Sequence, residues 1–298
     1  MKQLFILIGI LYTCLDIQAQ MPNDAIYMPK GTVCAGTMYT NSSWKEYWEN
    51  TLKRENLNMG MHTTQSVMIM PSIGITGRFN IILGLPYVWT KTSAGNLMGQ
   101  KGLQDLSVWL KVKAIDAKGF SINGLLGASL PASKYMPDFL PMSIGLQCRT
   151  VSGRILANYT HPRTGFYFTG HATYTWRSNI FIDRNAYQAN DRVYNTNEVG
   201  VPNATDMGIR VGILKPKWQT EVFAERFTCV SGDNIRRNDM PFPTNNMQAT
   251  TVGWYGKFQP KNIGINARIS HVTNGLNVGQ STSYMAGVLY LFNVTKNK

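Results

Sequence analysis

The chain has 298 residues, which is enough for one large domain or two modest ones. Its formal net charge is +13, but the basic residues are scattered along the sequence and form no single stripe, which argues against nucleic acid as a partner. Charged residues make up only 15% of the chain, against about 25% in a typical soluble domain, and this deficit favours a protein that contacts lipid.

Residues 1–19 have the features of a secretory signal peptide. Lys2 supplies the charged head, residues 4–15 are largely apolar, and Ala19 offers a cleavage site before Gln20. The apolar stretch is too short to span a bilayer as a helix. We therefore expect an exported chain in which the signal peptide is cleaved and residues 20–298 form a single domain.

Apolar and polar residues alternate in many segments, for example in GFYFTGHATYTWR at residues 165–177. Side chains on a strand point to opposite faces in turn, so such a segment has one apolar face and one polar face. The same period recurs at 79–87, 106–114, 120–130, 155–159, 207–213, 252–258 and 263–269, and helical periodicity is nearly absent. The pattern fits a soluble sheet that rests on a core, or a membrane barrel that faces lipid.

Short and long connections alternate between these segments, which decides between the two folds. Short links with turn-forming residues lie at 75–77, 116–119, 161–164, 215–217 and 259–262, and long polar links lie at 89–104, 131–142, 178–205, 230–248 and 274–281. Tight periplasmic turns and long outer loops are typical of outer-membrane barrels. We therefore predict an all-β fold, a transmembrane antiparallel up-and-down β-barrel, in the outer membrane of a Gram-negative-type bacterium.

The number of strands follows from closure of the barrel. Eleven strands can be counted from about residue 62 onward, and VCAGTMYT at residues 33–40 supplies another. A closed single-chain barrel of this kind needs an even number, so we predict about 12 strands, with ten or fourteen as alternatives. Residues 287–292 resemble the signal by which the barrel-assembly machinery recognises a last strand, although a polar tail follows them. We expect that machinery, outer-membrane lipids including anionic lipopolysaccharide, and small-molecule solutes as partners.

The stretch SSWKEYWENTLKRE at residues 42–55 departs from the strand pattern. Ser43 and Glu46 are spaced as a capping box, and Trp44, Tyr47 and Trp48 share one helical face. One interpretation is a helix or a strand extension in the first outer loop. The other is a plug or lid for the pore, built on the three aromatic residues.

Extending the alternation to the polar face gives a set of residues that we expect to line the lumen and the solute pathway. Rings of charge inside a pore select solutes by sign. Opposite charges on neighbouring strands also pair and hold a wet interior together, and we expect such pairing for most of the set, with a positive excess left to bias the solute. The set is Arg78, Lys111, Lys113, His171, Arg177, Arg210, Glu221, Glu225, Lys257, Asn266 and Arg268.

Catalytic motifs are weak in this sequence, which contains no GxSxG, no phosphate-binding glycine loop and no HExxH. SHVTNG at residues 270–275 resembles the His-x-Ser-Asn-Gly element of outer-membrane phospholipases. Thr273 stands where that element has serine, and a β-branched hydroxyl is a more crowded nucleophile. We expect no enzyme, no cofactor and no metal site, and a lipid hydrolase that uses His271, Thr273 and Asn274 is the alternative.

Four short segments resemble a known family of outer-membrane channels. They are LPY (85–87), GLQDLSVWLKVK (102–113), GRILANY (153–159) and YTWR (174–177). These segments are similar to the channels named for the meta-pathway of phenol degradation, which are relatives of the long-chain fatty-acid transporters of the outer membrane. The resemblance implies a porin-like transporter that passively passes small hydrophobic or amphipathic solutes, aromatic ones among them.

The same resemblance places Gly102 and Asp105 at the start of a strand, where they either shape the turn and cap the strand or contact the solute. A third class of function also fits a barrel: a non-transporting protein that serves adhesion or envelope structure through its outer loops.

Overall fold

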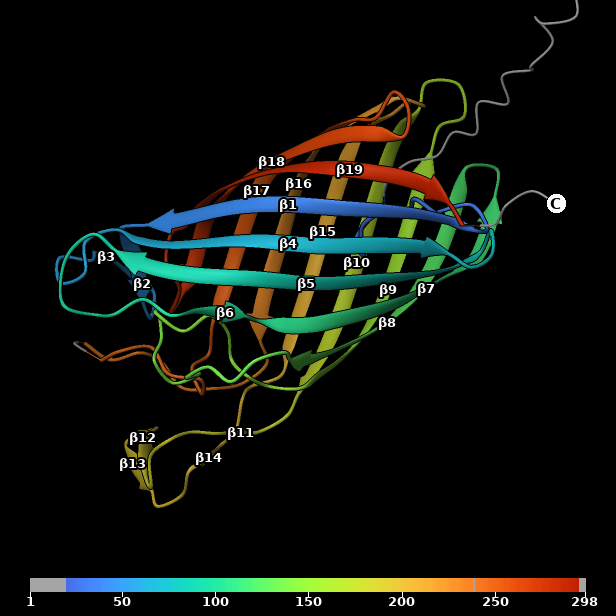
Figure 1. The fold of residues 1–298 in the computed structure, drawn as a ribbon. Helices are drawn as coiled ribbons and strands as arrows, with labels where there is room; N and C mark the ends of the chain where they lie inside the picture. Colours follow the sequence, from blue (N-terminus) through green and yellow to red (C-terminus); the bar gives the residue numbers. More distant parts are fainter. Residues whose placement is uncertain (1–19, 238, 295–298) are drawn as a thin grey trace, which may run out of the picture.

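The computed structural model describes residues 20–237 and 239–294, so the expected signal peptide lies outside the described residues. The described chain forms one antiparallel barrel, with the short turns at the end where β1 begins and the long loops at the other end (Figure 1). The expected fold class and strand number are confirmed. The twelve wall strands are β1 (Thr32–Trp44), β4 (His62–Gly74), β5 (Phe79–Thr92), β7 (Asp105–Ala117), β8 (Phe120–Pro131), β9 (Thr150–Thr160), β10 (Phe166–Arg177), β15 (Ala204–Leu214), β16 (Trp218–Cys229), β17 (Gln248–Phe258), β18 (Ile263–Leu276) and β19 (Thr282–Asn293).

Strand β1 closes the barrel. It pairs with β4 on one side and with β19 on the other, and the second register runs from Thr32 opposite Asn293 to Ser43 opposite Thr282. The VCAGTMYT segment that we predicted as the additional strand lies inside β1. Closure leaves the wall without the unpaired sheet edge that a lipid environment does not tolerate.

The outer loops carry short strands of their own. Strands β2 (Glu46–Glu49) and β3 (Leu52–Glu55) form a hairpin, and β6 (Lys101–Leu103) pairs with β5. In the loop between β10 and β15, β11 (Ile180–Phe181) pairs with β14 (Glu198–Val199), and β12 (Tyr187–Ala189) pairs with β13 (Arg192–Tyr194). The helix considered within residues 42–55 is wrong: β1 extends to Trp44 and the hairpin follows, so the strand extension is the correct alternative.

No helix within residues 20–237 and 239–294 is long and apolar enough to cross a membrane.

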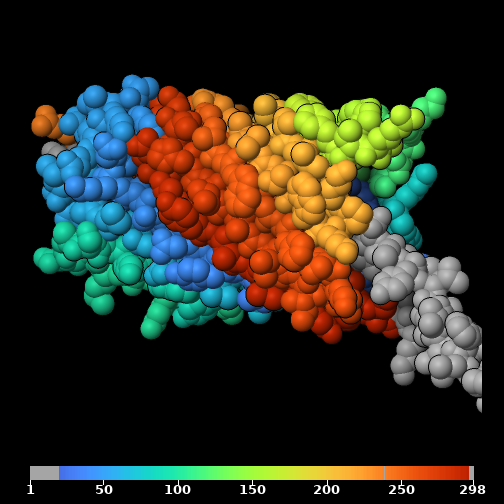
Figure 2. All heavy atoms as spheres, turned by 90° about the horizontal axis from the view of Figure 1, so that it is seen from above, coloured from blue at the N-terminus to red at the C-terminus, as the bar shows by residue number. Residues whose placement is uncertain are grey.

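The two faces of each wall strand differ as the alternation predicts, and β10 shows this clearly. On the apolar face Phe168 is 45% exposed and Trp176 is 53% exposed, whereas on the polar face Tyr167 is 5% exposed and Thr169 is 2% exposed. In a barrel the exposed side is the outside. Figure 2 shows the outer surface over β1 and β15 to β19 as a continuous wall of obliquely inclined strands. Its exposed apolar side chains form the belt that meets lipid.

This belt gives a prediction about depth in the membrane. Ile209 lies at the middle of β15 and is 52% exposed, so the substitution Ile209→Arg should lower the free energy of unfolding in lipid vesicles by about 2–4 kcal/mol. The matched control is Thr205→Arg, on the same face near the outer end of β15, which should cost only about 0–1 kcal/mol. If urea unfolding showed the same loss of unfolding free energy for both variants, that result would contradict a lipid-facing belt.

Candidate functional site

Residues 20–31, named here the lumen segment, lie inside the barrel and end at its periplasmic rim, where Lys30 is exposed. Ser72 Oγ on β4 donates a hydrogen bond to the Gln20 carbonyl at 3.1 Å, and Asn23 Nδ2 contacts a carboxylate oxygen of Glu225 on β16 at 3.4 Å. Strands β4 and β16 are separated by several strands in either direction around the barrel. A segment that reaches both therefore crosses the interior.

The Lys111 ammonium on β7 fixes the lumen segment at its centre. Nζ donates to the carbonyls of Met21 (3.3 Å), Asp24 (2.5 Å) and Ile26 (3.0 Å), and it also pairs with Asp24 Oδ1 at 3.0 Å. The Lys111 side chain is fully buried, and its Nζ lies 4.9 Å from the Tyr27 ring centre. Because an ammonium has three donors and no acceptor, it holds a loop of carbonyls around itself.

The end of the lumen segment docks on the wall through an apolar contact. Met28 is fully buried and packs with Cys34 on β1 and with Leu289 and Leu291 on β19. These three side chains belong to the inner face of the closing pair of strands. Burial of a methionine side chain against such a group contributes about 1.5–3 kcal/mol.

A glycine permits the close approach of the lumen segment to β4. A Cβ built on Gly74 would lie only 2.0 Å from the Pro29 carbonyl oxygen, so no other residue fits there without movement. In addition, the Gly31 N–H donates to the Gly74 carbonyl at 2.8 Å. The backbone of the segment thus continues directly into the wall.

A network of opposite charges, named here the ionic ladder, lines one side of the lumen. Arg210 on β15 is 2% exposed and pairs with Glu221 and Glu225 on β16, and Arg268 on β18 pairs with Glu225 at 2.7 Å. Further along the wall, His171 Nε2 on β10 lies 2.9 Å from Asp206 Oδ1, and Arg154 on β9 lies 3.7 Å from the same oxygen. The ladder consists of Arg154, His171, Asp206, Arg210, Glu221, Glu225 and Arg268.

The opposite side of the lumen is apolar and rich in sulfur. We name it the methionine wall, and it consists of Met38 on β1, Met68 and Met70 on β4, and Met285 on β19, with Ile82, Trp109 and Met21 of the lumen segment packed against them. The strand register explains the cluster, because Met38 is directly opposite Met68, and Met70 and Met285 are one step along the inner faces of the adjacent strands. Barrel lumens are ordinarily polar, so this wall is unusual.

The lumen segment has a cavity on each side. One, of about 450 Å³, lies between the methionine wall and the ionic ladder, and Asn23, Trp109, Arg154 and Arg268 are among its lining residues. The other, of about 350 Å³, lies beside Tyr27 and the paired Arg210 and Glu221. The lumen is therefore narrowed by the segment but is not completely filled.

The structure places most of the predicted lumen residues inside the barrel. Lys111, His171, Arg210, Glu221, Lys257 and Asn266 are buried on inner faces, and Lys113, Glu225 and Arg268 are half-buried there. Arg177 lies at the outer rim, where Nη1 donates to the Pro202 carbonyl at 3.1 Å. Arg78 is a correction: it lies exposed in the periplasmic turn between β4 and β5, because the extension of the polar face went one residue beyond the start of β5 at Phe79.

The three aromatic residues considered as a plug lie at the outer end of β1 and in the hairpin of the first outer loop. The Trp44 ring stacks on His62 with centroids 5.1 Å apart, and the backbone N–H of Trp48 donates to the Val278 carbonyl at 2.9 Å. Tyr47 bridges to Gly279 in the same loop between β18 and β19. These contacts join the first and last outer loops, while the segment that occupies the lumen is residues 20–31.

Sequence reasoning did not single out the lumen segment or the methionine wall. MPNDAIYMPKG at residues 21–31 has no strand period, and this absence beside a barrel strand was the available signal. For the methionine wall, the signal was that Met68 and Met70 share the inward phase of Ser72 on β4, which makes that phase apolar rather than polar.

The residues of the hydrolase alternative have other partners. His271 Nδ1 lies 2.9 Å from Thr282 Oγ1, and its Nε2 lies 3.3 Å from Gln280 Nε2. The Thr273 hydroxyl donates to the Thr250 carbonyl at 3.2 Å, and the register between β17 and β18 shifts at this point. The structure thus does not join His271 to Thr273 as base and nucleophile.

Asp105, from the segment that resembles the channel family, holds an outer loop. The Tyr135 hydroxyl donates to Asp105 Oδ1 at 2.7 Å, and the Gln147 N–H donates to the same hydroxyl at 2.8 Å. Burial, followed by the nearby Asp105 carboxylate, raises the pKa of the Tyr135 phenol, which therefore stays protonated as a donor. Asp105 acts here as an anchor for the loop at residues 132–149.

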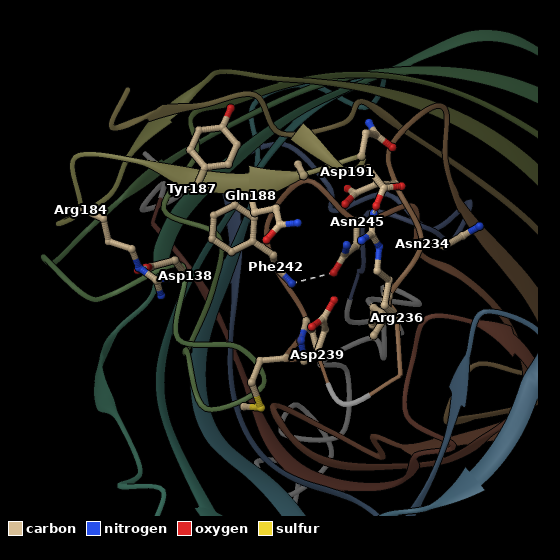
Figure 3. Close-up of a pocket in the computed structure, with 16 residues that line it drawn as sticks. Asp138, Arg184, Tyr187, Gln188, Asp191, Asn234, Arg236, Asp239, Phe242 and Asn245 are labelled. Carbon is tan, nitrogen blue, oxygen red and sulfur yellow. Dashed lines mark hydrogen bonds and ion pairs between the residues drawn. The ribbon is translucent and has the colours of Figure 1, made fainter. Parts of the chain in front are cut away.

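Three outer loops enclose a further pocket of about 250 Å³ (Figure 3). Arg184 Nε pairs with Asp138 Oδ2 at 2.7 Å across two of the loops, and Arg236 pairs with Asp191. The Tyr187 ring stacks on Phe242 with centroids 5.5 Å apart. These contacts tie the loops at 132–149, 178–203 and 230–247 together above the barrel.

Comparison with known proteins identifies the fold. No family model and no curated protein matches the chain. Among solved structures, the chain is similar to an outer-membrane channel from Pseudomonas putida F1, with a TM-score of 0.69 and 12% identity over 92% of this chain and 100% of that chain. The fold is that of an outer-membrane β-barrel. The translocator domain of the autotransporter NalP from Neisseria meningitidis is also similar, with a TM-score of 0.50 and 11% identity over 88% of each chain. This fold and the apolar belt place the chain in the outer membrane.

Proposed function

We propose that the chain is an outer-membrane channel through which small hydrophobic or amphipathic solutes, aromatic ones among them, pass by diffusion and without a cofactor. The observation that carries this proposal is the two-sided lumen, in which the methionine wall faces the ionic ladder across a cavity of about 450 Å³. An apolar surface opposite polar groups accommodates an amphipathic solute, because the apolar part of the solute contacts the apolar surface and the polar part contacts the polar groups.

The lumen segment sets the width of the path. Cavities lie on both sides of it, and a short movement of the segment away from Lys111 would join them. We infer that passage depends on such movement, because the charges of the ionic ladder pair with one another and leave the wall itself rigid. The resemblance of four short segments of the sequence to the phenol meta-pathway channels supports the same class of solute.

Uptake into liposomes tests the proposal. Purified protein reconstituted in vesicles should admit an aromatic sulfonate and a short-chain fatty-acid anion faster than protein-free vesicles do, and should admit glucose much more slowly. Uptake of glucose alone would overturn the inferred solute class but would still support a channel. Absence of uptake for all three solutes would favour the non-transporting barrel, for which the tied outer loops of Figure 3 offer a surface.

We also propose that the barrel-assembly machinery inserts the chain through β19 and that its basic side chains contact anionic lipopolysaccharide. Both proposals follow from the sequence of β19 and the net charge of +13.

A further inference from the structure

We propose that the cavity between the methionine wall and the ionic ladder is a binding site for an amphipathic anion, namely a compact apolar or aromatic body that carries one carboxylate. This inference rests on the proposed function, because the solute reaches the cavity through the channel. It goes further in naming the site, the sign of the charge and the residues that recognise each part of the ligand.

The apolar part of the site is built from soft and adaptable side chains. Met38, Met68 and Met285 line the cavity together with Ile82 and Trp109. Methionine thioethers are polarisable and contact aromatic rings favourably, and their unbranched side chains adjust to ligands of different shape. The cavity volume of about 450 Å³ lies within the range of small-molecule sites, about 300–1,000 Å³.

The charged part of the site is entirely basic. Arg154 and Arg268 are the two ionisable side chains among the described residues that line this cavity. The acidic members of the ionic ladder stay outside the lining, and Glu225 is already engaged by Arg210 and Arg268. A carboxylate placed in the cavity therefore meets two guanidinium groups and no acidic side chain within the lining.

Both guanidinium groups are held in place with donors to spare. Arg154 Nε donates to Thr173 Oγ1 at 2.7 Å, and its guanidinium lies 4.8 Å from the Trp109 ring centre. The Arg268 guanidinium lies 4.2 Å from the Phe223 ring centre. A guanidinium has five N–H donors, and the contacts of each group within the described residues occupy only one or two of them. Such a planar group binds a carboxylate through two parallel hydrogen bonds.

Hydroxyl groups complete the polar side. Thr40, Ser107, Ser270 and Ser283 line the same cavity, and each can donate to a carboxylate oxygen or a second polar substituent. Asn23 of the lumen segment lines it as well, so the site is assembled only while that segment is docked.

Binding of matched naphthalene probes to the full chain in lipid nanodiscs tests the inference, with protein-free nanodiscs as the reference for partition into lipid. By calorimetry, 2-naphthoate should bind about tenfold or more tightly than neutral 2-naphthamide. Arg154→Gln and Arg268→Gln should each remove most of this preference. Arg226→Gln, an exposed arginine of β16 outside the site, should leave it unchanged.

A second variant keeps the inference testable even if the two arginine variants do not fold. Ser270→Asp adds a carboxylate to the cavity and keeps both arginines, so it should weaken 2-naphthoate and strengthen 2-naphthylmethylamine relative to Ser270→Asn. Equal affinity of the wild type for naphthoate and naphthamide would overturn the inference, as would absence of naphthoate binding in a protein that still admits solutes to liposomes. Tight naphthoate binding by a protein that admits no solute would support the site and reject the channel.

Discussion

Replacing Lys111 by methionine should release the lumen segment and raise the time-averaged conductance of the barrel. Lys111 Nζ makes four contacts with the segment, and its loss removes the ammonium that pairs with the buried Asp24 carboxylate. Breaking a buried pair on one side costs about 3–5 kcal/mol, which shifts the docked state toward the released state. Hydrogen exchange of residues 20–31 should rise in parallel with the open probability in planar bilayers.

Lys113→Met is the matched control for this prediction. Lys113 lies two residues further along β7 and also contacts the Tyr27 ring, but its ion pair is with Asp116 near the periplasmic end. This variant should keep exchange and open probability close to those of the wild type. If Lys111→Met behaved like Lys113→Met in both measurements, the ammonium would not be the clamp of the segment.

Replacing Arg210 by methionine should destabilise the whole barrel. Arg210 is enclosed between Glu221 and Glu225, and without it Glu221, whose side chain is 1% exposed, keeps only neutral hydrogen-bond partners in the described structure. The expected loss is about 3–5 kcal/mol in the free energy of unfolding. Urea unfolding of the protein in lipid vesicles, followed by tryptophan fluorescence, measures it.

A double variant separates charge from packing in this prediction. Arg210→Met with Glu221→Met removes the Glu221 carboxylate as well and should recover much of the loss, because replacing both members of a buried pair is far less costly than removing one. Arg226→Met, on the exposed side of β16, should change stability little. If Arg210→Met alone were as stable as the wild type, the ionic ladder would not stabilise the barrel wall.

The wall of the barrel was predictable from the sequence because lipid imposes a simple rule. Segments such as residues 165–177 must turn one face to hydrocarbon and the other to the lumen, so the two-residue period is visible without any knowledge of tertiary contacts. Closure requires an even number of strands, which identified residues 33–40 as part of β1. The inward direction of His171 and Arg210 followed from the same period.

The contents of the lumen were not predictable in this way. Residues 20–31 are held mainly by backbone carbonyls around Lys111, and backbone groups carry no sequence signal. The methionine wall contradicts the assumption that every inward position is polar, and Trp109, on the inner face of β7, is a further exception to it. Local signals also misled at residues 42–55, where the capping box favoured a helix but β2 pairs with β3 instead.

Planar-bilayer recording of a chain that lacks residues 21–30 most directly tests whether the lumen is a conducting path controlled by its own N-terminal segment. Removal of these residues takes away Met21, Asp24 and Met28, and we expect it to join the two cavities beside them. The expected result is a single-channel current step clearly larger than that of the full-length barrel, in protein that still unfolds as a barrel. Absence of current steps in the folded deletion variant would contradict a path through the lumen.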